Sequence, residues 1–123
     1  MNRKQLIIVE DDPITQAAYL EALEHVDAHF VTTSSRAAQA LMSIMEPDLI
    51  FLDLGLPDGG GTTVINALNQ TYPDRHIPVV VVSSSTNIKR HEEAIQAGAV
   101  AIITKPFEPQ QIRDAVLRYA QKQ

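Results

Sequence analysis

The chain has 123 residues, no cysteine, a hydrophobic fraction of 45% and a formal net charge of −5 at pH 7. This length fits one domain over residues 1–123, and the absence of cysteine excludes disulfides and cysteine-ligated zinc. The acidic balance disfavours direct binding of nucleic acid, and every apolar run is shorter than the roughly 20 residues that span a membrane. No secretory signal precedes the first apolar run, so we expect a cytoplasmic protein without a membrane contact.

Five short apolar runs predict strands, which in chain order cover residues 5–9, 29–32, 48–52, 78–82 and 100–104. Helical patterns fill the gaps between them, over residues 13–25, 37–45, 64–72, 87–97 and 112–120. The second of these patterns has its apolar stripe at Ala37, Ala40, Leu41, Ile44 and Met45. The fourth is more polar, with only Ile88, Ala94 and Ile95 to bury, so we expect that helix to be loosely docked.

The alternation of strand and helix predicts a doubly wound α/β fold with helices on both faces of a parallel sheet. The near-continuous apolar runs favour the same arrangement, because strands of a parallel sheet are covered on both faces. In such folds the ligand lies outside the carboxyl ends of the strands. The residues that follow each predicted strand are therefore the candidates for a functional site.

Acidic residues follow two of the predicted strands. The first strand runs into Glu10, Asp11 and Asp12, and the third ends at Asp53. Asp12 precedes Pro13, and this pair is typical of a helix N-cap followed by proline at the first helical position, so we assign Asp12 to a structural cap. Glu10 and Asp11 then face Asp53, and three carboxylates suit Mg²⁺. A solvated acidic rim is the alternative.

The loops after the other strands add a hydroxyl and an ammonium group. Ser83 offers a hydroxyl to an oxyanion, although the neighbouring serines leave the exact residue open. Lys105 can neutralise phosphate oxygens as a point charge. Pro106 follows it, and a cis bond there would fix the direction of the ammonium group. Gly55 places a backbone carbonyl near the metal without a side chain in the way.

The sequence resembles the receiver domain of two-component response regulators over essentially its whole length. The resemblance rests on the segments IVEDDP, DLIFLDLGLPDGGG, PVVVVSS and AGAVAIITKPF and on their mutual spacing. Each segment is a weak signal alone, but all of them in this order are specific. The resemblance implies a (βα)5 flavodoxin-like receiver fold, with a five-stranded parallel sheet of strand order 2-1-3-4-5.

The resemblance also implies a chemical role for each acid. Asp53 falls on the family's aspartate that accepts a phosphoryl group from a sensor histidine kinase or a histidine phosphotransfer protein. Glu10 and Asp11 fall on the acidic pair, with Asp11 binding Mg²⁺ directly and Glu10 through water. The carbonyl that ligates the metal falls on Gly55.

The family's phosphate-stabilising hydroxyl and ammonium fall on Ser83 and Lys105. One position departs from the family pattern. Three residues before the lysine, the family usually has Phe or Tyr, whose rotamer change reports the movement of the hydroxyl to the surface. This chain has Ile102 there, which is β-branched and stiff at its first torsion. We expect phosphoryl transfer to survive and the output to differ, through the fourth helix itself.

We therefore expect a phosphorylation-activated signalling switch, not a conventional enzyme, that catalyses its own phosphorylation and dephosphorylation. Its downstream protein target is not identified by the sequence, and the face of helix four, strand five and helix five can pair two copies in this family. A phosphorylation-independent interaction module and a receiver fragment of a longer regulator with an effector domain remain alternatives. A haloacid dehalogenase-type phosphatase is disfavoured, because Gly55 stands where that family has a second aspartate.

Overall fold

The computed structural model describes residues 4–24, 26, 28–58, 61–84 and 86–120. Strands and helices alternate in the order β1 (Gln5–Val9), α1 (Pro13–Ala22), β2 (Ala28–Thr32), α2 (Ser35–Met42), β3 (Leu49–Leu52), α3 (Gly61–Thr71), β4 (Val79–Ser83), α4 (Ile88–Ala97), β5 (Ala101–Thr104) and α5 (Pro109–Tyr119). The strands form one parallel sheet in the order β2-β1-β3-β4-β5. The predicted α/β fold and strand order are confirmed.

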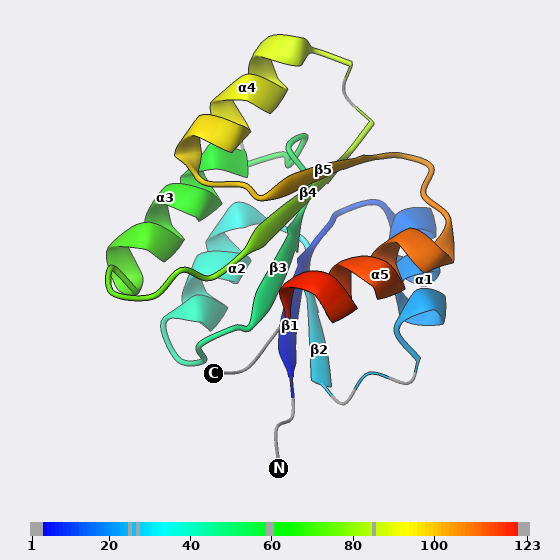
Figure 1. Ribbon diagram of the computed structural model, residues 1–123, viewed down its shortest axis with the longest axis horizontal. Helices are drawn as coiled ribbons and strands as arrows, with labels where there is room; N and C mark the ends of the chain where they lie inside the picture. Colours follow the sequence, from blue (N-terminus) through cyan, green and yellow to red (C-terminus); the bar gives the residue numbers. More distant parts are fainter. Residues whose placement is uncertain (1–3, 25, 27, 59–60, 85, 121–123) are drawn as a thin grey trace.

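Helices cover both faces of this sheet. Figure 1 shows α2, α3 and α4 on one face and α1 and α5 on the other. Successive residues of a strand point to opposite faces, so each apolar run supplies both layers. In β3, for example, Ile50 and Leu52 belong to the layer under α2, α3 and α4, whereas Leu49 and Phe51 belong to the layer under α1 and α5.

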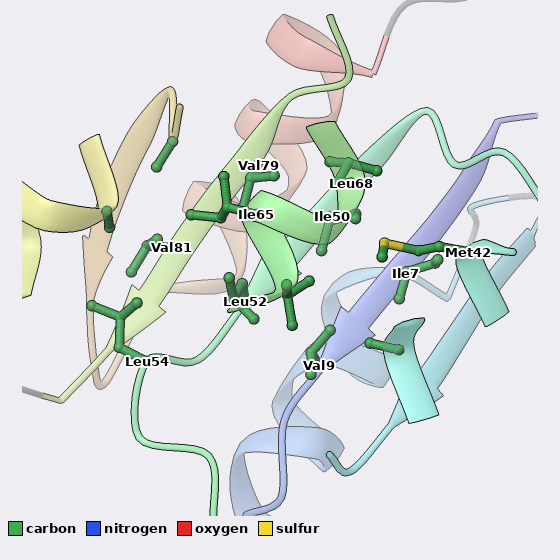
Figure 2. Packing of buried hydrophobic residues seen from close by; sticks show 14 of the residues in the cluster. Ile7, Val9, Met42, Ile50, Leu52, Leu54, Ile65, Leu68, Val79 and Val81 are labelled. Atoms are coloured by element: carbon green, nitrogen blue, oxygen red, sulfur yellow. The ribbon is translucent and has the colours of Figure 1, made fainter. Parts of the chain in front are cut away.

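The layer under α2, α3 and α4 is continuous from β1 to β4. Figure 2 shows Ile7 and Val9 of β1, Ile50 and Leu52 of β3, and Val79 and Val81 of β4, together with helix residues such as Leu68. The strand residues of this set are at most 1% exposed. Burying such a side chain stabilises the fold by about 1.5–3 kcal/mol.

The predicted stripe of the second helix is partly wrong. The helix ends at Met42, and its buried residues are Ser35, Ala38 and Met42. Ala37 and Ala40 are exposed, as is Ile44 beyond the helix end. The hydroxyl of Ser34 caps this helix by accepting from the Ala37 N–H at 3.0 Å. The cap marks where the helix begins, whereas the burial of Ala38 and Met42 shows which side of it faces the sheet, and a count of apolar residues alone does not reveal that side.

The fourth helix buries less than its apolar residues suggested. Ala94 is fully buried, but the side chains of Ile88 and Ile95 are 70% and 47% exposed. The predicted loose docking agrees with this single buried contact residue, whereas the predicted burial of the two isoleucines is wrong.

Among the described residues, no helix is long and apolar enough to cross a bilayer.

Candidate functional site

The strand register brings the predicted acids to one edge of the sheet. Val9 of β1 pairs with Leu52 of β3, so the next residues, Glu10 and Asp53, lie at the same level. The Asp53 N–H donates to the Val9 carbonyl at 3.0 Å, which continues the ladder one residue beyond the strand. The carboxyl ends of β1 and β3 therefore present their acids side by side.

Three carboxylates meet at this edge. Ligand oxygens of Glu10, Asp11 and Asp53 all lie within 4.8 Å of one another. Glu10 is fully buried and Asp53 is 7% exposed, whereas Asp11 is exposed. Asp12 points elsewhere: it is the N-cap of α1, and its carboxylate accepts from the Thr15 N–H at 3.0 Å. The neighbouring acids thus separate into a cap and a cluster.

Lys105 links two of these acids. Its Nζ lies 2.6 Å from Glu10 Oε1 and 3.2 Å from Asp53 Oδ2. Burial raises the pKa of Glu10 above its ordinary value, although the hydrogen bond from Lys105 acts in the opposite direction. Burial also acts to lower the pKa of Lys105, but the hydrogen bond to Glu10 and the charge of Asp53 outweigh it, so that pKa is raised. The ammonium group therefore stays charged and partly neutralises the cluster.

Backbone contacts bring Ser83 and Lys105 to the same edge. Ser83 ends β4, is 2% exposed and pairs with Thr104 of β5. The Lys105 N–H donates to the Ser83 carbonyl at 3.0 Å. The Lys105–Pro106 bond is cis. Ile102 of β5, at the position where the resemblance implies Phe or Tyr in most members of the family, is half-buried and packs against the layer under α2, α3 and α4.

Gly55 contacts Asp53 through its backbone. The Gly55 N–H donates to Asp53 Oδ1 at 3.0 Å. A Cβ built on Gly55 would meet Asp53 Oδ1 at 3.6 Å, an ordinary van der Waals distance. A methyl group at this position would therefore fit beside the Asp53 carboxylate.

The donor set fits a hard divalent cation. All candidate ligands are oxygens, as Mg²⁺ prefers. Three carboxylates and one ammonium leave two negative charges, which one divalent cation balances. The two Glu10 oxygens already have partners, because Oε1 meets Lys105 and Oε2 accepts from the Asp12 N–H at 3.1 Å. Asp11 is thus better placed than Glu10 for a direct bond to a metal.

Sequence reasoning missed two side chains that hold the loops of this site. The Gln16 amide in α1 donates to the Glu10 carbonyl at 2.7 Å, and the Arg90 guanidinium in α4 donates to the Leu54 carbonyl at 2.7 Å. Glutamine six residues after an acid carries no recognisable pattern. Arg90 lies 36 residues from its partner, so only the folded chain reveals the contact.

Residues 6–117 match the family model described as the response regulator receiver domain. The transcriptional regulatory protein KdpE of Staphylococcus aureus is 37% identical over 115 residues, which cover 92% of this chain and 48% of that protein. The regulatory protein LuxO of Vibrio cholerae is 34% identical over 111 residues, which cover 89% of this chain and 24% of LuxO. The chain spans half or less of the length of these relatives.

Solved structures show the same fold at lower identity. A CheY-like receiver domain protein from Methanospirillum hungatei superposes with a TM-score of 0.87 at 21% identity, over 97% of this chain and 94% of that chain. The receiver domain of the sensor histidine kinase PA1611 from Pseudomonas aeruginosa has a TM-score of 0.85 at 19% identity, over 97% and 98%. That receiver domain has a magnesium ion coordinated in its active site cleft.

Proposed function

The chain belongs to the response regulator receiver family, whose standard function is a phosphorylation-activated switch, and from this premise we propose that Asp53 is the phosphoryl acceptor. One observation carries the assignment. Asp53 is the carboxylate that contacts both the Lys105 ammonium and the Gly55 N–H, at the edge where the acids meet. We extend the assignment to Glu10, Asp11 and the Gly55 carbonyl as metal ligands.

The transfer is a displacement at phosphorus. A carboxylate oxygen of Asp53 forms a bond to phosphorus while the bond from phosphorus to the imidazole nitrogen of a phosphohistidine breaks. The imidazole keeps the electron pair and takes a proton, and Asp53 becomes an acyl phosphate. The Lys105 ammonium group, which lies beside Asp53, would stabilise the charge on the transferred oxygens. The Ser83 hydroxyl would turn to donate a hydrogen bond to one of these oxygens. A bound Mg²⁺ would supply further neutralisation of that charge.

The burial pattern supports this division of labour. Glu10 is fully buried and holds Lys105, so it orients the ammonium group. Asp11 is exposed and can meet an incoming hydrated cation. Because these residues would position the reacting groups, the domain would catalyse its own phosphorylation and the later hydrolysis of its acyl phosphate. It would not be an enzyme for another substrate.

Receiver domains interact with histidine kinases and with downstream effector domains. We propose that this chain takes its phosphoryl group from such a kinase, or from a histidine phosphotransfer protein, in the cytoplasm. Phosphorylation would then change the surface that contacts a protein target, with the α4–β5–α5 face as a candidate for pairing two copies. Domain boundaries at residues 1–123 are part of the same proposal. Ile102 in place of an aromatic residue favours an output through α4.

The test combines intact mass with amide spectra. The protein is incubated with acetyl phosphate and Mg²⁺, beside Asp53→Asn and the matched control Asp74→Asn, which changes an exposed acid away from the cluster. We expect wild type and Asp74→Asn to gain the mass of one phosphoryl group and Asp53→Asn to gain none. Modification of Asp53→Asn to the same extent would exclude Asp53 as the acceptor.

The same samples test the route of the output. We expect amide shifts across residues 86–104 when beryllofluoride and Mg²⁺ are added, and none when Mg²⁺ is omitted. Identical spectra of the free and activated protein in this segment would show that α4 does not carry the signal. Mass gain without any spectral change would indicate a receiver that accepts phosphate but does not switch.

A further inference from the structure

An arginine from α4 reaches the loop that follows the proposed phosphoryl acceptor. The Arg90 side chain lies in the first turn of α4, which begins at Ile88 after the N-cap Asn87. Its Nη2 donates to the carbonyl oxygen of Leu54 at 2.7 Å. The guanidinium borders a hollow of about 200 Å³ that is lined by Leu54, Gly61, Thr62, Arg90 and Glu93. Leu54 directly follows Asp53, so the contact joins α4 to the site itself.

The Leu54 carbonyl and the Gly55 N–H belong to the same peptide unit. A trans peptide is planar, and its C=O and N–H point in opposite directions. Arg90 binds the carbonyl end at 2.7 Å, and the N–H end donates to Asp53 Oδ1 at 3.0 Å. The orientation of one rigid plane therefore sets both contacts. Hydrogen bonds in a chain also polarise one another, so the hydrogen bond from Arg90 to the Leu54 carbonyl strengthens the one that the Gly55 N–H donates to Asp53.

The side chain of Leu54 fixes the peptide from another direction. Leu54 is 2% exposed and belongs to the layer under α2, α3 and α4, and Figure 2 shows it just beyond the end of β3. A Cβ added to Gly61 at the start of α3 would lie 2.6 Å from Leu54 Cδ2 and 3.2 Å from its Cα. Leu54 is thus packed against α3, while its carbonyl remains available to Arg90. The hydrogen bond from Arg90 restrains the orientation of this peptide plane.

We propose that Arg90 is a positioning residue that holds the Leu54–Gly55 peptide toward Asp53 and couples the charge state of Asp53 to helix α4. The proposal rests on the proposed function of Asp53. Phosphorylation moves negative charge from the carboxylate to the phosphoryl oxygens, so the acceptor that the Gly55 N–H prefers changes position. The peptide plane turns to follow it, and the carbonyl at its other end withdraws from Arg90.

The coupling has a clear target in α4. This helix buries Ala94 alone among its residues, so it has few packing contacts to hold it against a change at its first turn. Ile102 is stiff and lacks the aromatic ring that carries the signal in the family pattern. The contact from Arg90 to Leu54 gives the site a second route to the same helix, through the backbone and one guanidinium group.

The experiment compares Arg90→Gln with Lys89→Gln. Both residues are exposed and lie in the first turn of α4, and each substitution removes one positive charge, but the hydrogen bond to the Leu54 carbonyl comes from Arg90. The first measurement is the Gly55 amide proton shift without Mg²⁺ or a phosphoryl donor. The second is the initial rate of phosphorylation by acetyl phosphate, and the third is the set of amide shifts over residues 88–97 on activation.

For Arg90→Gln we expect an upfield shift of the Gly55 amide proton, a rate lower by about fivefold, which corresponds to one modest hydrogen bond, and a smaller response of α4. Lys89→Gln should match wild type in all three. A Gly55 shift and an α4 response in Arg90→Gln equal to those of wild type would overturn the proposal, and so would equal losses in both variants. If wild type accepts no phosphoryl group, the proposed function fails, whereas the resting Gly55 shift still tests the positioning by Arg90.

Discussion

Replacing Lys105 by methionine removes the charge from the acidic cluster while keeping a side chain of similar length. Nζ of Lys105 lies 2.6 Å from Glu10 Oε1 and 3.2 Å from Asp53 Oδ2. The Glu10 side chain is completely buried, and those of Asp53 and Lys105 are 9% and 13% exposed. Without the ammonium group, the buried Glu10 carboxylate stands next to Asp53 with no cation beside it, and the pKa of Glu10 rises further above its ordinary value.

Two limits bracket the cost of this change. Breaking a fully buried ion pair costs about 3–5 kcal/mol, whereas a surface pair contributes about 0–1 kcal/mol. Lys105 lies between these cases, because its contacts are buried but the neighbouring Asp11 is open to water. We expect Lys105→Met to lower the free energy of unfolding at pH 7 by about 2 kcal/mol when no divalent cation is present.

Mg²⁺ should bind this variant more tightly than wild type. With all three carboxylates ionised, the cluster would present three negative charges to the cation instead of a net two. A unit charge about 4 Å from a divalent cation contributes about 2 kcal/mol in water, and salt reduces this, so we expect an increase in affinity on the order of tenfold. Under the proposed function, phosphorylation should nevertheless become slower, because the variant lacks the ammonium group that would stabilise the transferred oxygens.

Urea unfolding with and without Mg²⁺ measures both effects, and Lys89→Met serves as the control because it removes a charge from an exposed position. The control should unfold at the wild-type midpoint under both conditions. If Lys105→Met also kept the wild-type midpoint without Mg²⁺, the ion pairs would not stabilise the fold. If its stabilisation by Mg²⁺ were smaller than that of wild type, the cluster would not be the metal site.

Two further predictions concern the loop after β3. Hydrogen bonds from the backbone N–H groups of Arg36 and Ser35 lower the pKa of Asp58 below its ordinary 3.8. The ionised Asp58 therefore stabilises the fold above pH 3.8, and this stabilisation is lost as the pH falls through the lowered pKa. Urea midpoints of Asp58→Asn should therefore lie below wild type at pH 7 and approach it in acid; a constant difference would contradict this assignment. Gly61→Ala should lower the free energy of unfolding by about 1–3 kcal/mol in the same assay, because the added Cβ would lie 2.6 Å from Leu54 Cδ2. Gly55→Ala should cost less, because its Cβ would lie 3.6 Å from Asp53 Oδ1. The reverse order would refute the packing argument.

The fold was predictable because its signals are local and repeated. The five apolar runs and the helical patterns between them need no knowledge of distant contacts, and their alternation admits few topologies. The Asp12-Pro13 pair marked the start of α1 for the same reason, since a cap acts within one turn. The boundaries of the strands differ from the predicted ones by a single residue at most at each end, as at Leu49 and Val79.

The errors arose where packing, not periodicity, decides. Ala37 and Ala40 fit a helical stripe, but α2 packs with Ala38 and Met42 toward the sheet. Ile88 is apolar and remains 70% exposed, because α4 is held mainly through its small residue Ala94. In each case the sequence carries the right elements, and the rotation of a helix about its axis depends on contacts that are distant in the chain.

The candidate site divides in the same way. Acids at strand ends were found because parallel strands carry their carboxyl ends to one edge. The contact between Arg90 and Leu54 was not predicted, because the two residues are 36 positions apart in the sequence and the contact depends on the length and direction of one side chain. Local rules thus locate the candidate reacting groups, whereas the residues that hold those groups in place are found only in the folded chain.

The resting site also indicates how one modification would reach two surfaces. Asp53 has one carboxylate oxygen on the Lys105 ammonium and the other on the Gly55 N–H. Under the proposed function, phosphorylation turns one of these oxygens into the bridge of an acyl phosphate and moves the negative charge to the phosphoryl oxygens, so the preferred acceptors of both donors change. The Lys105 backbone is bonded to the Ser83 carbonyl, so one change is transmitted to the ends of β4 and β5. The change at the Gly55 N–H would pass through the Leu54–Gly55 peptide to α4. Substitutions at Lys105 and at Arg90 would therefore affect the two routes separately.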